Sequence, residues 1–223
     1  MTNALESLRA HLPAVSDAAW EQLALWAELM REWNERVNLV SRKDIDQLER
    51  HHLAPCLAVT GMLKLMHGAR VIDVGTGGGL PGVPMAICYP QARFTLVDSV
   101  GKKIRVVEDI VKRLGLKNVE VRNCRVETIK TKYDFVTGRA VTDLAAFINW
   151  IRPLCRKGKT HSLPNGLLYW RGGDVQAEAA GLHSRLTRSL GLEEVLADPY
   201  FKDKYILQFK AEELRREEPA IRA

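Results

Sequence analysis

The stretch Val71–Gly82 reads VIDVGTGGGLPG, and it decides the fold. A run rich in β-branched residues around Asp73 passes into a glycine-rich turn and then meets Pro81, a residue favoured in the first turn of a helix. Glycine accepts positive φ and lets the backbone approach a ligand closely. The stretch therefore predicts a strand, a tight loop and a helix, with the loop shaped to hold a ligand.

Strands and helices alternate in the sequence from Gly68 onward. We expect strands at 70–74, 93–98, 119–122, 133–137, 167–171 and 205–209, and helices at 81–88, 102–114, 144–154 and 174–190. Such alternation is typical of an α/β fold with a mainly parallel sheet that is covered by helices on both faces.

The N-terminal part is predicted to be helical. Apolar residues recur at three- and four-residue intervals over 17–33, and the helical spacing of the three tryptophans there favours core packing over a base-stacking surface. A second helical stretch over 45–66 is expected to break near Pro55. The polar segment between them is expected to be a loop with a helix cap at Ser41 or Asp44.

These patterns divide the chain into three parts. We expect a helical extension over 1–67 packed on the core, an α/β domain over 68–210, and a charged, solvated and mobile tail over 211–223. The 223 residues suffice for one such domain with an extension.

Composition narrows the function classes. The net charge of +6 gives weak support to a polyanionic partner. The first residues lack an apolar signal core and no apolar run is long enough for a bilayer, so we expect a cytoplasmic protein. The four cysteines are dispersed without zinc spacing, and His51 and His52 are adjacent residues that point to different faces of a helix, so no metal site is assigned.

Two kinds of nucleotide loop can be compared with the glycine stretch. In the G-x-G-x-x-G frame of dinucleotide sites, counted from Gly75, the sixth position is Leu80 and Gly79 comes one residue early. The alternative frame has glycines at alternate positions after Asp73 and a carboxylate, Asp98, at the end of the second strand. This layout suits a nucleoside without pyrophosphate, whose ribose hydroxyls bind the carboxylate. A plain nucleotide loop or tight strand–helix packing remains open.

Here the residues resemble the class I S-adenosylmethionine-dependent methyltransferases. Six segments in order are similar to the bacterial 16S ribosomal RNA guanine-N7 methyltransferase family, also called glucose-inhibited division protein B. They are NERVNLVS at 34–41, RH at 50–51, GTGGGLPG at 75–82, LVDSVGKK at 96–103, RVE at 125–127 and GRAV at 138–141. The resemblance implies a class I (Rossmann-like) fold, S-adenosylmethionine as cofactor, and 16S rRNA or the small ribosomal subunit as partner, with no metal and no membrane.

The resemblance also implies a cofactor site. It is formed by Gly75, Gly77, Leu80, Asp98, Val126, Glu127 and Arg139. Asp98 would bind the ribose, Val126 and Glu127 would flank the adenine, and Asp73 would lie near the methionine amino group. Val126 is also explained as a core residue. Family members often carry Asp and Ser where this chain has Ala54 and Pro55, so no role is assigned to the Arg50–His51 segment.

Missing motifs indicate which atom is methylated. Amine methylation usually accompanies Asn/Asp-Pro-Pro-aromatic after the fourth strand, where this chain reads TGRA at 137–140, and Asp198–Tyr200 is better explained as a turn. Carbon methylation of pyrimidines needs a cysteine nucleophile, and none directly follows that strand. Guanine N7 has an unprotonated lone pair and needs no general base. We therefore predict no catalytic acid or base; Arg139 is the candidate for organising the site, with a structural salt bridge as its alternative role.

Basic residues provide candidate RNA contacts. Those predicted are Arg36, Lys102, Lys103, Arg125 and Lys157, which would position phosphates without reading sequence. The competing functions are a non-catalytic RNA-binding or ribosome-assembly protein, a small-molecule methyltransferase, and a nicotinamide-dependent oxidoreductase, against which Leu80 already counts. A monomer is expected.

Overall fold

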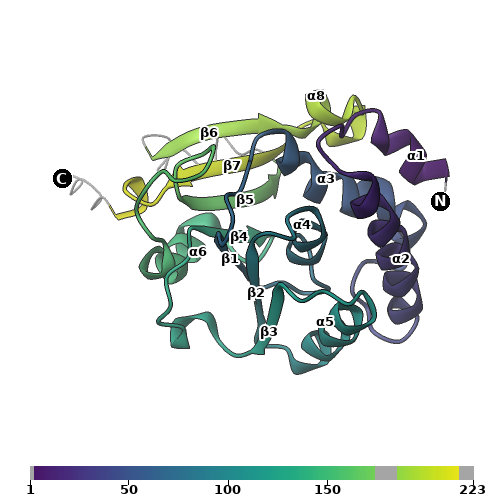
Figure 1. The fold of residues 1–223 in the computed structure, drawn as a ribbon, viewed down its shortest axis with the longest axis horizontal. Coiled ribbons are helices and arrows are strands. Elements are labelled where there is room, and N and C mark those ends of the chain that lie inside the picture. Colours follow the sequence, from purple (N-terminus) through teal and green to yellow (C-terminus); the bar gives the residue numbers. More distant parts are fainter. Residues whose placement is uncertain (1–2, 174–184, 216–223) are drawn as a thin grey trace.

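A twisted sheet runs through the protein and carries helices on both sides (Figure 1). The computed structural model describes residues 3–173 and 185–215. Within them the sheet has seven strands in the order β3-β2-β1-β4-β5-β7-β6. The strands are β1 (Arg70–Val74), β2 (Arg93–Asp98), β3 (Val119–Asn123), β4 (Phe135–Arg139), β5 (Gly166–Gly172), β6 (Leu186–Gly191) and β7 (Lys204–Lys210).

The sheet is mainly parallel, as predicted. Strands β1 to β5 pair in parallel, and β7 and β6 complete the sheet in antiparallel pairs. Strand β1 is the first strand of the sheet, and β2 and β3 are added on one side of it. The chain then returns to form β4 on the other side of β1, so the strand order reverses between β1 and β4. Ligands of open parallel sheets bind at the carboxyl ends of strands beside such a reversal.

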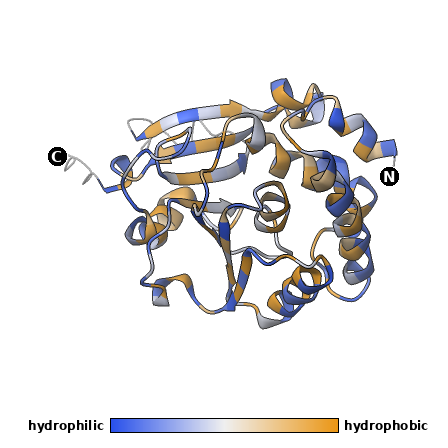
Figure 2. Ribbon diagram, in the orientation of Figure 1, coloured by the Kyte–Doolittle hydropathy of each residue, from blue (hydrophilic) through white to orange (hydrophobic). Residues whose placement is uncertain are grey.

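Alternating side chains of β1 explain why both faces of the sheet are covered. Val71 belongs to an apolar cluster shared with α2 and α5, whereas Ile72 and Val74 belong to a second cluster shared with α6. Figure 1 shows α2 and α5 on one side of the sheet and α6 on the other, and Figure 2 shows the hydrophobic central strands. The α-helices are α1 (Asn3–Arg9), α2 (Asp17–Asn34), α3 (Ala54–Leu57), α4 (Gly82–Cys88), α5 (Gly101–Arg113), α6 (Leu144–Ile151) and α8 (Leu192–Leu196).

Helix α2 packs on the domain through its tryptophans, which confirms their predicted core role. Trp20 and Trp26 are buried, and the partly buried Trp33 donates from Nε1 to Asp109 Oδ2 of α5 at 2.8 Å. Ser16 caps the helix by accepting from the backbone N–H of Ala19.

The loop after α2 is closed by Asn34, whose side-chain oxygen accepts from the backbone N–H groups of Leu39 and Val40 at 2.9 and 3.0 Å. The predicted helix cap at Ser41 or Asp44 is wrong. The Ser41 hydroxyl accepts from the Lys43 N–H at 3.4 Å, within the turn that precedes the helical residues. Asp44 precedes a short 3-10 turn (Ile45–Gln47) but makes no capping bond. Its carboxylate contacts two histidines instead, because the next helical turns bring their imidazoles within reach.

The predicted break at Pro55 is also wrong. A π-helical turn (Leu48–Leu53) leads directly into α3, and the proline lies in the first turn of α3. No backbone N–H is required at that place, so the helical path continues to a 3-10 turn (Ala58–Gly61).

Two predictions near the C-terminus need correction. The helix predicted over 174–190 lies outside the described residues up to 184, and its last part forms β6, because pairing with β7 outweighs local propensity. The tail predicted over 211–223 begins with packed residues: Ala211 and Leu214 are buried, and Arg215 donates to the backbone oxygen of Cys155. No helix of residues 3–173 and 185–215 has the length and apolar character needed to cross a membrane.

Candidate active site

A cleft of about 490 Å³ lies at the carboxyl ends of β1, β2 and β4. Its walls come from the loop after β1, the end of β2, the turns after β3 and β4, and the loop that follows α2. Every residue of the predicted cofactor site lines it: Gly75, Gly77, Leu80, Asp98, Val126, Glu127 and Arg139. The tertiary structure therefore places the predicted residues together.

The glycine loop is conformationally suited to a ligand. Gly75, Gly77 and Gly79 have φ values of 68°, 57° and 90°, a region that L side chains rarely adopt. A Cβ on Gly77 would meet no heavy atom closer than the Gly75 backbone oxygen at 3.9 Å. The space beside Gly77 is therefore open, and because Gly77 also lines the cleft, the loop leaves room for a ligand there.

Asp73 stabilises the glycine loop through hydrogen bonds at its two ends and is not among the cleft-lining residues. Its Oδ2 accepts from the Thr76 hydroxyl at 2.6 Å and the Gly82 N–H at 3.1 Å, and its Oδ1 accepts from the Thr137 hydroxyl at 2.8 Å. Burial raises the pKa of Asp73 to about 6, against the opposing effect of these hydrogen bonds. The carboxylate thus ties β1, β4 and α4 together, and its location near the methionine amino group stays a prediction.

Asp98 presents its carboxylate to the cleft. Oδ2 accepts from the Gly77 N–H at 2.9 Å and Oδ1 from the Val100 N–H at 2.8 Å. Each carboxylate oxygen can accept more than one hydrogen bond. The side chain is therefore oriented by the backbone and retains acceptor capacity for two adjacent hydroxyl groups, as a ribose would supply.

The opposite side of this part of the cleft is a short 3-10 turn, Val126–Thr128. Val126 is buried in the α6-side core and also lines the cleft, so its core position is confirmed and its contact with the adenine stays a prediction. Glu127 is partly exposed, and Arg125 lies 3.5 Å from its Oε1. The turn combines an apolar surface with polar edges, which suits a flat heterocycle such as adenine.

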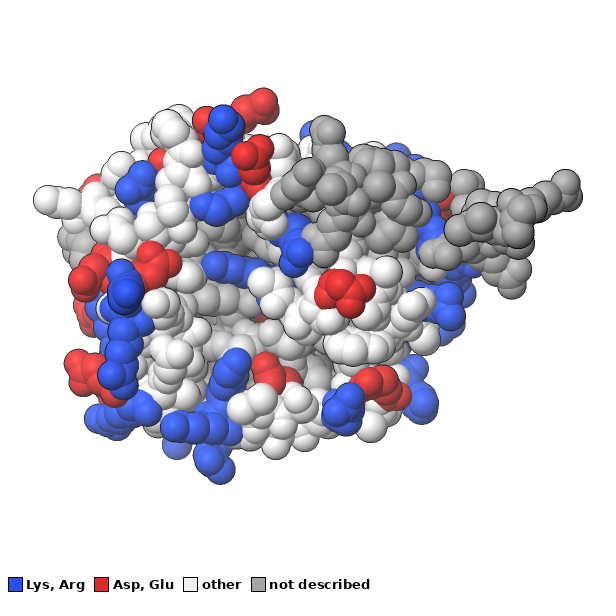
Figure 3. All heavy atoms as spheres, turned by 180° about the vertical axis from the view of Figure 1, so that it is seen from behind, with Lys and Arg blue, Asp and Glu red and all other residues white. Residues whose placement is uncertain are grey.

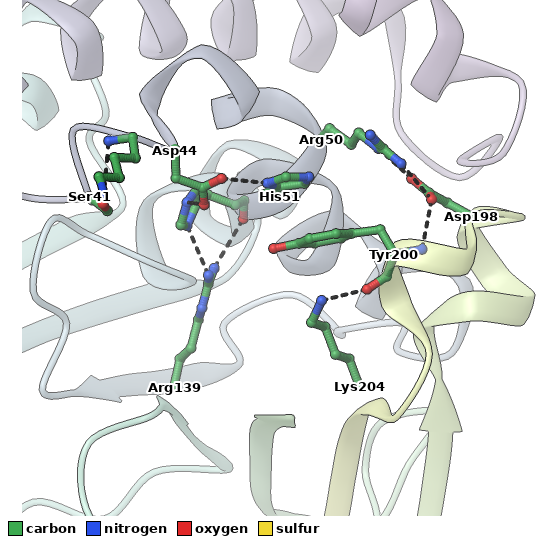
Figure 4. Close-up of polar contacts among 10 residues, drawn as sticks. Ser41, Asp44, Arg50, His51, Arg139, Asp198, Tyr200 and Lys204 are labelled. Atoms are coloured by element: carbon green, nitrogen blue, oxygen red, sulfur yellow. Dashed lines mark hydrogen bonds and ion pairs between the residues drawn. The ribbon is translucent and has the colours of Figure 1, made fainter. Parts of the chain in front are cut away.

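At the end of β4, Arg139 lines the cleft and contacts two residues, His52 and Cys56, that are not among the predicted site residues. Its Nη1 donates to the backbone oxygen of His52 at 3.2 Å and lies 3.9 Å from Cys56 Sγ, and its Nη2 lies 2.9 Å from His52 Nδ1. His52 Nε2 is in turn 2.7 Å from Asp44 Oδ2. Figure 4 shows this chain of contacts leading away from Arg139. Among the described residues Arg139 makes no salt bridge to a carboxylate, because the imidazole of His52 lies between it and Asp44.

The predicted RNA contacts fall into two groups. Lys103 and Arg125 line the cleft, Lys102 precedes Lys103 in the first turn of α5, and Arg36 is exposed on the loop after α2. Lys157 lies elsewhere, beside the amino ends of β4 and β5. The face drawn in Figure 3 is hollowed near its centre and carries Lys and Arg side chains around the hollow. Within residues 3–173 and 185–215, no group of three or more His, Cys, Asp or Glu side chains could hold a metal ion.

The sheet order, the glycine loop after β1 and the carboxylate that ends β2 define the class I methyltransferase fold. A solved structure of a mutant of MtNAS in complex with S-adenosylmethionine shares this fold, with a TM-score of 0.52 and 15% sequence identity over 86% of this chain and 76% of that one.

The chain belongs to the family of the rRNA small subunit methyltransferase G (GidB), whose sequence profile matches residues 19–185. The ribosomal RNA small subunit methyltransferase G of Flavobacterium johnsoniae is 38% identical over 203 residues, covering 91% of this chain and 96% of the relative. Its namesake from Porphyromonas gingivalis is 39% identical over 204 residues, covering 91% of each protein. The family expected from the sequence segments is confirmed, and with it the methyltransferase class and S-adenosylmethionine as the methyl donor.

Proposed function

We propose that this protein transfers the methyl group of S-adenosylmethionine to N7 of a guanine in 16S ribosomal RNA. The observation that carries the proposal is the cleft at the carboxyl ends of the strands, where Gly77 leaves open space and Asp98 presents its carboxylate to a ligand. The chain that forms this cleft belongs to the rRNA small subunit methyltransferase G family. The bound cofactor supplies a methyl group on a positively charged sulfur, ready for attack by a nucleophile.

The glycine loop, Asp98 and the turn at Val126 are proposed to hold the cofactor. Gly75, Gly77 and Leu80 give backbone and apolar contact, Asp98 accepts from the ribose hydroxyls, and Val126 with Glu127 borders the adenine. These groups are oriented by main-chain hydrogen bonds and by core packing before any ligand arrives, which lowers the entropic cost of binding.

The residues around the end of β4 support a nitrogen acceptor over a carbon acceptor. Cys56 contacts Arg139, with Sγ 3.9 Å from Nη1, and it is fully buried. Burial raises the pKa of Cys56 to about 12, so the sulfur is a thiol at neutral pH and a poor nucleophile. The covalent step that carbon methylation requires is therefore not available from this cysteine.

Guanine N7 requires only alignment from the protein. Its lone pair carries no proton, so no general base is needed, and the protein contributes by placing the base against the methyl group and excluding water. Leu39 and Val40 give the cleft an apolar wall, and Arg139 supplies hydrogen-bond donors to the cleft. Arg36, Lys102, Lys103 and Arg125 are proposed to contact phosphates near the cleft; Lys157 is left out because it lies at the other edge of the sheet.

A methyl-transfer assay tests the proposal. Purified protein is incubated with S-adenosylmethionine and with either naked 16S rRNA or small ribosomal subunits that lack the modification, and the RNA is digested and analysed for N7-methylguanosine. The Asp98→Ala variant serves as the cofactor-site control, with an expected loss of cofactor affinity of tenfold or more, or about 1.4 kcal/mol. Absence of N7-methylguanosine on both substrates, with normal cofactor binding, would overturn the enzyme assignment and favour a non-catalytic RNA-binding role.

A further inference from the structure

The contacts of Arg139 determine the protonation state of His52. A guanidinium group has only donors, so the Nη2 atom of Arg139, 2.9 Å from His52 Nδ1, must donate to that nitrogen. His52 Nδ1 is therefore an unprotonated acceptor, and the ring is neutral with its proton on Nε2. That N–H points at Asp44 Oδ2, 2.7 Å away. The imidazole thus passes the orienting effect of the Asp44 carboxylate to Arg139.

The electrostatic surroundings act in the same direction. Burial lowers the pKa of His52, the positive charge of Arg139 lowers it further, and the Asp44 carboxylate opposes them. The other titratable groups facing this imidazole are His51 and Cys56, which donates from Sγ to the His52 backbone oxygen. A neutral His52 is consistent with the direction in which its pKa is shifted.

Asp44 and His52 are themselves held in place. His51 Nδ1 lies 2.6 Å from Asp44 Oδ1, and its ring stacks on Tyr200 with centroids 3.6 Å apart and an interplanar angle of 7°. Arg50 makes two contacts with Asp198, at 2.6 and 2.8 Å. Arg50, His51 and His52 all belong to the π-helical turn 48–53, a rare conformation that occurs frequently at functional sites. Figure 4 shows that this turn contacts Arg139 on one side and the segment that carries Asp198 and Tyr200 on the other.

Arg139 lies at the β4 side of the cleft, away from Asp98; we call this side the acceptor end, because the base that accepts the methyl group is proposed to bind there. Asp98 ends β2 on one side of β1, whereas Arg139 ends β4 on the other side, and Leu39 and Val40 add apolar side chains to the lining of the same cleft. Three contacts of its guanidinium go to His52 and Cys56 through Nη1 and Nη2, and Nε–H is used in none of them. Arg139 is thus a fixed cation whose Nε–H is used in none of these three contacts, in a cleft that also has apolar walls. Such a group suits a base that presents a hydrogen-bond acceptor at its edge.

We propose that Asp44 and His52 are positioning residues that hold Arg139 so that it donates to O6 of the target guanine. Adenine presents an amino group at the same place and would meet a donor with a donor, so the arrangement selects guanine. This inference rests on the proposed function, since it assigns the acceptor end of the same cleft.

Two substitutions of His52 separate its two contacts. His52→Asn places an amide oxygen near the position of Nδ1 and keeps an acceptor for Arg139, but loses the contact with Asp44. His52→Gln places its amide nitrogen near the position of Nε2 and keeps a donor to Asp44, but leaves Nη2 of Arg139 without the side-chain acceptor at the position of Nδ1; the backbone oxygen of residue 52 still accepts from Nη1. His67→Gln, on an exposed histidine far from this end of the cleft, is the control for loss of a histidine.

The two variants are compared in single-turnover methyl transfer, with S-adenosylhomocysteine affinity measured by calorimetry. We expect the transfer rate of His52→Gln to fall about 10- to 100-fold, as for a misplaced active-site group, and that of His52→Asn to fall clearly less. Cofactor affinity should stay within about threefold of wild type, below 0.7 kcal/mol, in both. In the wild type the rate should decline as the pH is lowered and His52 gains a proton, because a protonated Nδ1 cannot accept from Arg139; His52→Asn should lack that decline.

A second readout does not depend on activity. Nitrogen-15 NMR of histidine-labelled wild-type protein should show His52 neutral, with its proton on Nε2, near pH 7. A proton on Nδ1, equal rate losses in the two His52 variants, or a parallel loss of cofactor affinity would overturn the positioning role. Failure of the wild type to make N7-methylguanosine overturns the proposed function instead, whereas normal product with an unaffected His52→Gln overturns only this inference.

Discussion

Replacing Asp73 by Asn should make the protein's stability respond differently to pH. Asp73 is fully buried and its pKa is raised to about 6. The folded state therefore holds this proton more tightly than the unfolded chain, and the free energy of unfolding falls as the pH rises from the unfolded pKa through the folded one. Asn keeps the essential contacts, since its amide oxygen accepts from Thr76 and Gly82 while its nitrogen faces Thr137 Oγ1.

The magnitude follows from the pKa shift. The pKa of Asp73 is about 6 in the folded protein and about 4 in the unfolded chain, a difference that corresponds to roughly 3 kcal/mol of stability in total. About 1.4 kcal/mol of this is lost between pH 5 and pH 7.5. The unfolding free energy of Asp73→Asn, minus that of the wild type, should grow by about that amount over this interval, because only the wild type loses a proton there.

Urea unfolding followed by circular dichroism at the two pH values measures this difference. Asp46→Asn, at an exposed position on the 3-10 turn before the π-helix, is the matched control for the loss of one carboxylate. An Asp73→Asn difference that is the same at both pH values, or one that shrinks as the pH rises, would contradict a raised pKa of Asp73 in the folded protein.

Three further substitutions test other parts of the structure. Gly77→Ala adds a Cβ that points into the cleft at a φ of 57°, so calorimetry should show about tenfold weaker binding of S-adenosylhomocysteine, or about 1.4 kcal/mol. Gly138→Ala would place a Cβ 2.4 Å from Phe147 Cζ, and thermal unfolding should reveal a loss of about 1–3 kcal/mol from overpacking. Arg31→Met removes the partner 2.6 Å from buried Glu49 and should cost about 3–5 kcal/mol in urea unfolding. Adding Glu49→Leu should recover most of that loss; no recovery would contradict a buried-charge effect.

The sequence predicted the central strands well. The bounds expected for β1 and β2 agree with the observed Arg70–Val74 and Arg93–Asp98. Both are short apolar runs bounded by polar or turn residues, as buried parallel strands require. The helix bounds also agree within a few residues where a cap or a glycine marks the end, as Ser16 does for α2 and Gly115 does after α5.

The failures share a different cause. The segment 186–190 became part of β6 because a neighbouring strand supplied its hydrogen-bond partners, which no local pattern can reveal. Similarly, Asp44 was predicted to cap a helix from its residue type, and the tertiary structure instead directed its carboxylate to two imidazoles.

The residues proposed to hold the cofactor could be predicted from the sequence by itself, and they line one cleft. Its glycine loop and Asp98 are only 21 residues apart at the Gly77 contact and belong to one strand–turn–helix–strand unit, whose local geometry brings them together. The acceptor end was decided only by the tertiary structure. Arg139 and His52 are 87 residues apart on elements that meet through packing, and their contact, like the neutral state of the imidazole, follows from the burial and charge created when those elements meet.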